Sequence, residues 1–293
     1  MGAAGIACPA LLCCWLNRCL SRVPIVFDVT GKRSQKRLGQ SDSLQGENDF
    51  LPFPSRPSQT IVPIGSCYEK HETTNGITGS YKLQERIELT TTTGSIDVEV
   101  DPQSGDEPAY LVLASNTGRI RVRMAPTFLA RRQVPSRAIF TEIRTVTGAI
   151  SAEILLGHGG YADIETVTGQ QHLSLLLYDV GPDDVASNIT TSSRTGQQRI
   201  VVQPLVPSIT PITNINAQHR GTATAALNLD YPRQWNGEIY ALASPLGNVE
   251  IDGSQLEFTR YSEHEKMAYR GSASSRHRVD AISIGTGSVS FIC

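Results

Sequence analysis

Residues 87–100 read IELTTTTGSIDVEV, and the fold can be inferred from this stretch. Before the glycine the apolar side chains stand at odd positions, Ile87 and Leu89, and after it they stand at even positions, Ile96 and Val98. Because the side chains of a strand alternate between its two faces, each half predicts a strand with one buried face. The change of parity at Thr-Gly indicates a tight connection that keeps both buried faces on one core.

The same turn recurs along the chain. Five copies of a Ser/Thr-x-Thr-Gly pattern end at Gly94, Gly118, Gly148, Gly169 and Gly196, and looser copies end at Gly76, Gly247 and Gly287. The parity change accompanies the five copies and two of the looser ones. Successive glycines of the five are 24, 30, 21 and 27 residues apart, which is enough for two short strands and their connections. The sequence therefore predicts an all-β domain of stacked strand–Thr-Gly–strand units, with the five glycines as structural turns.

Two architectures can use such a unit. Hairpins with a two-residue Thr-Gly loop, in which glycine supplies a positive φ, would stack into a two-sheet sandwich. An irregular β-solenoid with Thr-Gly corners is the alternative, and the unequal spacing argues against a strictly regular one. In the hairpin arrangement the Ser or Thr three residues before each glycine faces inward, near backbone groups and other hydroxyls. Gln171 and Gln198 replace the usual Ile after the turn, so a less uniform core is expected there.

Composition limits the partners and divides the chain. The net charge of the 293 residues is −2, so no global field attracts nucleic acid, and no nucleic-acid partner is expected. The low charged fraction of 18% suits short strands better than surface helices. Residues 1–63 read as an apolar, Cys-rich segment followed by a disordered linker rich in Ser, Gln, Asn and Pro. Residues 64–293 form the predicted β-repeat domain.

The cysteines do not form a disulfide framework. Four of them, Cys8, Cys13, Cys14 and Cys19, lie in or directly after the apolar N-terminal run, and adjacent cysteines do not have zinc-ligand spacing. Only Cys67 and Cys293 remain for the β domain, where a disulfide between them would clamp its two ends. No metal site is expected.

The polar motifs do not assemble a recognisable reaction centre. Gly157-His158-Gly159-Gly160 resembles an esterase oxyanion loop, but no Gly-x-Ser-x-Gly elbow accompanies it. The stretch from Ser262 to Lys266 brings together a hydroxyl, a base and an acid, yet is better explained as a solvated loop. We therefore predict no catalytic residue, no cofactor and no enzyme activity.

Two surface features carry alternative interpretations. Arg119, Arg121 and Arg123 share one face of a predicted strand, which is either an ordinary exposed face or a contact for an anionic polymer or lipid. Asn188-Ile189-Thr190 fits the glycosylation pattern and matters only if the domain is secreted.

The repeat resembles a family of filamentous-fungal proteins, a domain of unknown function, in which Thr-Thr-Asn-Gly-like turns precede Ile-x-Val strands. More loosely, it is similar to bacterial adhesin-type domains. The resemblance covers about residues 76–293 and rests on segments such as 91–100, 115–124 and 145–154. It implies a stacked-strand fold with no assigned catalytic residues, and the Gln residues after two turns depart from it.

Three function classes follow. The leading hypothesis is a non-enzymatic β-repeat scaffold or interaction protein that binds a protein or polysaccharide partner. It would be cytoplasmic, with peripheral membrane contact through its N-terminus. The alternatives are a secreted or wall-associated adhesin-like protein and a hydrolase whose site is assembled from distant loops.

The N-terminal segment is predicted to attach the protein to a membrane. Cysteines in an apolar run followed by basic residues are a setting for reversible S-palmitoylation, and stable attachment needs two such signals. An unmodified or disordered start is the alternative. Wild type should pellet with membranes in cell fractionation, whereas a variant with Cys8, Cys13, Cys14 and Cys19 changed to Ser should be soluble. Equal distribution of the two proteins would contradict the tether.

Overall fold

The computed structural model describes residues 67–131, 136–178, 180–181, 184–207, 211–271 and 277–293. The N-terminal cysteines and the basic linker lie outside these ranges, so the interpretations placed on them stay predictions. Within the described residues the chain is all-β, as predicted, with two mostly parallel sheets of 11 and 9 strands. The one helix among these residues is α1 (Pro126–Arg131), and no helix there has the length and apolar character that a membrane span requires.

Each sheet has a spatial order that differs from the order of its strands in the chain. From one edge to the other, the 11-stranded sheet contains β1 (Cys67–Glu72), β3 (Arg86–Thr93), β5 (Ala109–Thr117), β7 (Ile139–Thr147), β9 (Tyr161–Thr168), β11 (Ser187–Thr195), β13 (Ile215–Ala223), β19 (Arg278–Gly285), β15 (Gly237–Ala243), β18 (Glu265–Arg270) and β17 (Glu257–Tyr261). The 9-stranded sheet contains, in the same direction, β2 (Ile77–Leu83), β4 (Ile96–Pro102), β6 (Ile120–Met124), β8 (Ile150–Leu156), β10 (Gln171–Leu177), β12 (Gln198–Pro204), β14 (Leu227–Asp230), β20 (Val289–Ile292) and β16 (Val249–Asp252).

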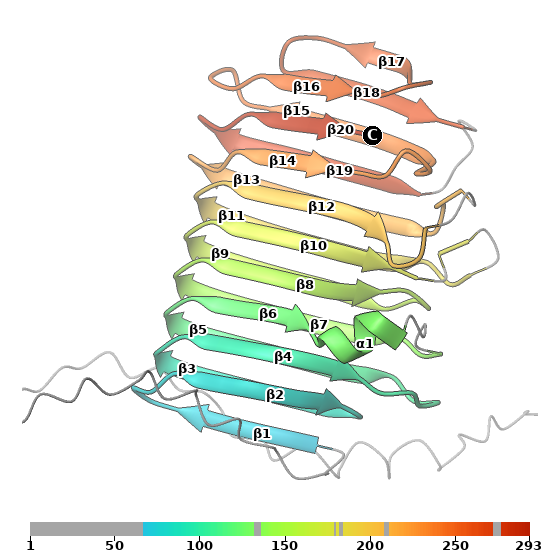
Figure 1. Cartoon of the computed structure of the whole chain (residues 1–293). Helices are drawn as coiled ribbons and strands as arrows, with labels where there is room; N and C mark the ends of the chain where they lie inside the picture. Colours follow the sequence, from blue (N-terminus) through green and yellow to red (C-terminus); the bar gives the residue numbers. More distant parts are fainter. Residues whose placement is uncertain (1–66, 132–135, 179, 182–183, 208–210, 272–276) are drawn as a thin grey trace, which may run out of the picture. The chain divides into compact units, whose positions relative to one another are not determined.

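The hairpin interpretation of the Thr-Gly turn is wrong. Strands joined by a Thr-Gly step do not pair with each other: β3 pairs in parallel with β5, and β4 pairs in parallel with β6. The turn is a corner that carries the chain from one sheet to the other, so two consecutive strands form one layer (Figure 1). At the five Thr-Gly corners the separation between inward residues is also odd, as from Thr91 to Ile96. Parity alone therefore could not distinguish the two geometries. At the looser copies that end at Gly247 and Gly287 the predicted parity change does not occur, since the buried residues have odd numbers both before and after the corner, as at Ser283 and Val289.

The close contact between the backbones of neighbouring layers explains why glycine occupies the Thr-Gly corners. The N–H of Gly118 donates to the carbonyl oxygen of Thr147 in the next layer at 2.9 Å, and that of Gly148 donates to Thr168 at 2.9 Å. A Cβ added to Gly148 would lie 1.9 Å from the carbonyl oxygen of Gly118. Because no side chain fits into that contact, the corner needs glycine for close approach of two backbones as well as for its φ of 155°.

An inward row of hydroxyls supports the corners, as the sequence predicts. Thr91, Ser115, Thr145 and Thr166 are buried. The hydroxyl of Ser115 donates to the carbonyl oxygen of Gly94 at 3.0 Å, and that of Thr145 donates to Gly118 at 3.3 Å. Each hydroxyl thus donates to a corner carbonyl of the preceding layer and supplies it with a hydrogen-bond partner.

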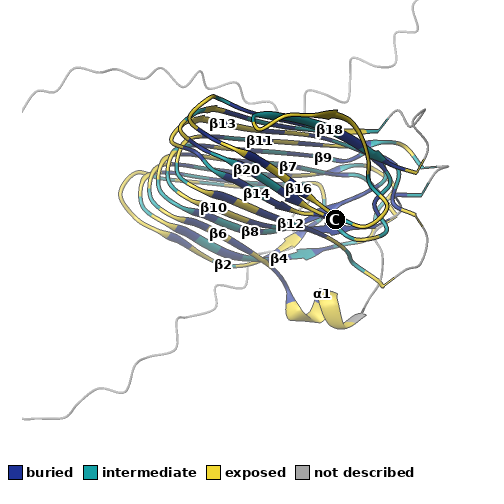
Figure 2. Ribbon diagram, turned by 90° about the horizontal axis from the view of Figure 1, so that it is seen from above, coloured by how far each residue is buried: buried dark blue, intermediate teal, exposed yellow. Residues whose placement is uncertain are grey.

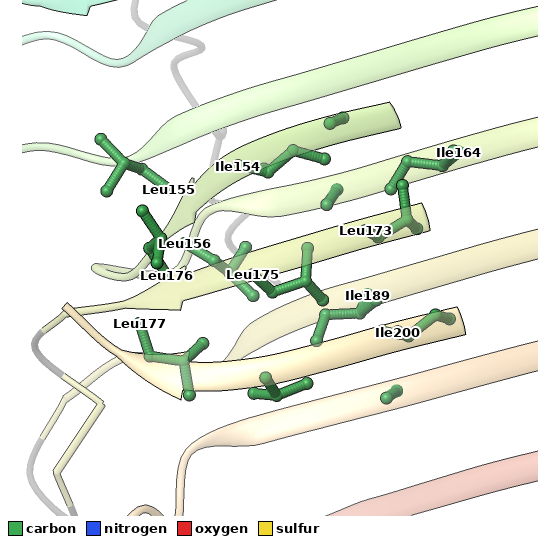
Figure 3. Close-up of a cluster of buried hydrophobic side chains, with 14 of the residues drawn as sticks. Ile154, Leu155, Leu156, Ile164, Leu173, Leu175, Leu176, Leu177, Ile189 and Ile200 are labelled. Atoms are coloured by element: carbon green, nitrogen blue, oxygen red, sulfur yellow. The ribbon is translucent and has the colours of Figure 1, made fainter. Parts of the chain in front are cut away.

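The core lies between the two sheets. Inward side chains from both sheets form one cluster of buried apolar residues, part of which is drawn in Figure 3, where Ile154, Leu175 and Ile200 of the 9-stranded sheet approach Ile164 and Ile189 of the other. Exposed residues gather along the corner edge and on α1 (Figure 2). Parallel sheets are usually covered on both faces, whereas these keep polar outer faces open to solvent.

The last strands of the chain are inserted into the stack. In space, β19 lies between β13 and β15, and β20 lies between β14 and β16. Along the chain, β15 and β16 come before β19 and β20 but lie one layer farther from β13 and β14. The antiparallel pair β17–β18 follows, and β19 and β20 then form the layer in between. The antiparallel pair extends the 11-stranded sheet beyond the other sheet, and its edge strand β17 is short, exposed and bulged, which discourages further pairing.

Cys67 and Cys293 do not form the disulfide that would clamp the two ends of the domain. Neither cysteine is part of a disulfide bond. Cys67 lies in the terminal strand β1, whereas Cys293 follows β20 near the opposite end of the stack. With strands about 4.8 Å apart, several intervening layers separate the two sulfur atoms by far more than a disulfide spans.

Substituting a corner glycine should destabilise the β domain. In Gly148→Ala the new methyl group would have to displace the backbone of the neighbouring corner, so the free energy of unfolding should fall by about 1–3 kcal/mol or more. Gly181→Ala is the matched control, because its Cβ would meet one side-chain atom, Asp184 Oδ2 at 3.3 Å, and no backbone atom. Chemical denaturation of the three proteins measures the difference, and a Gly148→Ala protein as stable as wild type would contradict the corner geometry.

Candidate functional site

The outer face of the 11-stranded sheet carries an in-register row of aromatic and amide side chains. Tyr110, Phe140 and Tyr161 stand side by side on β5, β7 and β9, and the row continues through Asn188 and Asn216 on β11 and β13. The ring centroids of Tyr110 and Phe140 are 5.1 Å apart in an edge-to-face contact, and those of Phe140 and Tyr161 are 4.9 Å apart and stacked. The three rings therefore form a continuous half-exposed apolar strip.

A second row, polar except for Val112 on β5, runs parallel to the first. It contains Val112, Glu142, Asp163, Thr190 and Gln218 in register on the same five strands. We call these two rows, ten residues on β5, β7, β9, β11 and β13, the aromatic–amide face. Its amides and hydroxyls are open to solvent, since Asn188, Thr190 and Gln218 are exposed.

Hydrogen bonds within the face hold its polar side chains in place. The Tyr161 hydroxyl donates to Glu142 Oε1 at 2.6 Å, and Arg144 donates to Asp163 Oδ2 at 3.0 Å. Burial and the neighbouring Glu142 carboxylate raise the pKa of Tyr161, so the phenol remains a donor at neutral pH. Asn216 donates to Asn188 Oδ1 at 3.4 Å, which starts an amide ladder. Both carboxylates of the second row thus already have partners.

The aromatic row was missed in the sequence, although a signal for it is present. Tyr110, Phe140, Tyr161 and Asn188 each precede a corner glycine, Gly118, Gly148, Gly169 and Gly196, by eight residues. In each strand these residues alternate with the buried ones, so their side chains lie on the outer face. Aligning the repeats on the glycines would have shown three aromatic residues at one outward position of consecutive units.

A polar network lies inside the core beside these strands. His219 and Gln198 are fully buried, as is Thr191, and the hydroxyl of Thr191 donates to Gln198 Oε1 at 2.7 Å. His219 Nδ1 lies 2.9 Å from Thr191 Oγ1, and its Nε2 lies 3.0 Å from the hydroxyl of Tyr231. The Gln198 amide donates to the carbonyl oxygen of Arg220 at 2.7 Å.

These bonds are mutually consistent with one tautomer of His219. Because Thr191 donates its only hydroxyl hydrogen to Gln198, the hydrogen between Thr191 and His219 must come from Nδ1, and Nε2 accepts from Tyr231. Burial lowers the pKa of His219 to about 3, so the ring is neutral. The network resembles a catalytic relay in composition, but its members are sealed in the core and stabilise the layers.

Gln171 and Gln198 interrupt the uniform core, as expected from their position after the corner. Both are fully buried, and the Gln171 amide donates to the carbonyl oxygen of Ser192 at 2.6 Å. Each glutamine therefore bonds to the backbone of the facing sheet at a position where Ile provides only packing in other layers.

The two motifs considered for catalysis lie at turns between strands. The Gly157-His158-Gly159-Gly160 segment is the turn between β8 and β9, where a Cβ on Gly157 would lie 1.9 Å from the carbonyl oxygen of Tyr178. The stretch from Ser262 to Lys266 covers the turn between β17 and β18 and the first residues of β18. There, His264 Nδ1 lies 2.8 Å from the carbonyl oxygen of Gly247. No cluster of three or more potential metal ligands occurs in the described ranges.

The arginine stripe lies beside an acidic strand. Arg123 forms ion pairs with Asp97 at 3.2 Å and with Glu99 at 3.9 Å, and Arg121 is in register with Asp97 on β4. The stripe is therefore partly neutralised, which weakens its suitability for an anionic polymer. Asn188 of the glycosylation pattern is exposed on β11, within the aromatic–amide face.

In comparisons with known proteins, no family model, no curated protein and no solved structure matches the chain. The resemblance to fungal repeat proteins and adhesin-type domains therefore stays a prediction.

Acid should destabilise the protein through His219. Its pKa is about 3 in the folded protein against an ordinary value of 6.5, so the unfolded chain takes up the proton first as the pH falls. The stabilising contribution of neutral His219 is complete above about pH 6.5 and is lost progressively as the pH falls from 6.5 to 3. At pH 4.5 the loss is about 2–3 kcal/mol.

The variant His219→Gln should remove this part of the pH dependence, with a lower free energy of unfolding at pH 7 but a flatter slope down to pH 4.5. His172→Gln is the matched control, since His172 is exposed on β10 and has no buried network to lose. Denaturation at both pH values measures the slopes. An unchanged slope in His219→Gln would show that another group controls the acid response.

Proposed function

We propose that the protein is a non-enzymatic β-solenoid scaffold that binds an extended partner through its aromatic–amide face. The observation that carries this proposal is the in-register row of Tyr110, Phe140, Tyr161, Asn188 and Asn216. A cytoplasmic location with membrane contact through the N-terminus is a separate proposal that rests on the sequence alone, and a secreted or wall-associated location is the alternative.

The pairing of the strands supports the solenoid. Consecutive strands alternate between the two sheets, and each layer lies in parallel register on the next through most of the stack. Repeated layers give a rigid, flat surface whose side chains recur with the strand spacing of about 4.8 Å. Such a surface suits a partner that is itself extended and repetitive.

The chemistry of the face supports binding. Exposed aromatic rings with an adjoining set of hydrogen-bond donors and acceptors are enriched at recognition surfaces, because the rings supply contact area and the polar groups supply orientation. The rings are held by one another and Glu142 is held by Tyr161, so little side-chain entropy remains to be lost on binding.

Recovery of partners from native cells tests this function. Wild type should retain a partner that Tyr110→Ala/Phe140→Ala loses, while an Arg199→Ala variant on the opposite sheet retains it. A hydrolase-directed covalent probe should label none of the three proteins. Labelling that disappears when one Ser or His is substituted would overturn the non-enzymatic assignment, and partner retention by the double variant would overturn the role of the face.

A further inference from the structure

We propose that the partner of the aromatic–amide face is a neutral linear polysaccharide lying across β5 to β13. The proposal rests on the proposed function and names the ligand class of the same face. It follows from three properties of the face: the order of its apolar and polar side chains, its balance of charges and the length of its rows.

The order of side chains matches the two kinds of surface on a sugar. A pyranose ring presents C–H groups on its faces and hydroxyls around its rim. Tyr110 and Phe140 offer apolar ring surface, and Asn188, Thr190 and Gln218 offer exposed amides and a hydroxyl that both donate and accept hydrogen bonds. Amide groups suit vicinal hydroxyls because one side chain can donate to one and accept from the other.

The charge balance favours a neutral ligand. Of the acidic groups on the face, Asp163 pairs with Arg144 at 3.0 Å and Glu142 accepts from Tyr161 at 2.6 Å. The β11 and β13 part of the two rows consists of Asn188, Asn216, Thr190 and Gln218, which carry no charge. Within the two rows, an acidic polysaccharide or a phosphorylated ligand would meet two carboxylates, Glu142 and Asp163, and no basic side chain.

A protein partner fits the face less well. Protein interfaces bury a core enriched in large apolar residues and depleted of charged groups. The strip of rings on this face is one residue wide and is bordered by Glu142, Asp163 and Arg144. Burying these groups under a protein would remove their water, whereas a sugar chain replaces that water with hydroxyls.

The length of the face suits several sugar units. Five strands about 4.8 Å apart give a row about 19 Å long between its first and last side chains. Individual contacts of this kind are weak, so affinity should come from a chain that contacts several positions at once. Binding should therefore grow with the length of the oligosaccharide.

Co-sedimentation with insoluble polysaccharides tests the proposal, using microcrystalline cellulose, chitin and a β-1,3-glucan as probes. The protein should be produced without glycosylation, because a glycan on Asn188 would cover part of the face. Wild type should bind at least one probe, and 1 M NaCl should leave the binding unchanged because no ion pairs with the ligand are involved. Tyr110→Ala/Phe140→Ala should weaken it about tenfold or more.

Phe258→Ala/Tyr261→Ala is the matched control. These residues form another exposed edge-to-face pair, with centroids 5.4 Å apart, on β17 outside the face, and the variant should bind as wild type does. If Tyr110→Ala/Phe140→Ala melts at a lower temperature, Asn188→Leu/Asn216→Leu supplies a second test that keeps the rings, and it should also weaken binding.

Each contrary outcome has a distinct meaning. No binding of wild type to any probe, equal binding by all variants, or binding abolished by salt would overturn the polysaccharide proposal. If native-cell partners still depend on Tyr110 and Phe140 in that case, the proposed scaffold function stands with a protein ligand. If those partners are also retained by the double variant, both proposals fail.

Discussion

The backbone contact at the Thr-Gly corners is the constraint on which the rest of the structure depends. The corner glycines Gly94, Gly118, Gly148 and Gly169 donate their N–H groups to the next layer, and no side chain fits above the preceding carbonyl group, as at Gly118 and Gly148. The contact sets both the spacing and the register of the layers. Once the register is set, residues at equal distances from a corner must form rows, both inside and outside the stack.

The two kinds of row have different consequences. Inside, the rows provide apolar packing and, near β11 and β13, a closed hydrogen-bonded network around His219 that has no exposed member. Outside, the rows remain accessible and present chemical groups at regular intervals. The outer rows are therefore the surface to which we assign the proposed binding, whereas the lowered pKa of buried His219 is expected to make the layers sensitive to acid.

The insertion of β19 and β20 makes the end of the stack different from a simple repeat. The layer of β15 and β16 joins the preceding layers through the last two strands of the chain. The stack therefore cannot be completed at this end until the C-terminal residues are in place. The aromatic cluster of Tyr231, Trp235 and Phe291, with centroids 5.1 to 5.7 Å apart, packs the inserted layer against its neighbours.

By itself, the sequence determined the all-β class, the positions of most corners and the inward row of hydroxyls, because these depend on local alternation and on glycine. It did not reveal the corner between β13 and β14, where Ala225 stands in the place of the corner glycine and Ala223 adopts a φ of 54°. Only the tertiary structure decided that the strands pair in parallel with the next layer, since a hairpin and a Thr-Gly corner produce the same parity. It also decided the order of the last layers and the juxtaposition of Tyr110, Phe140 and Tyr161, because these depend on contacts between residues far apart in the chain.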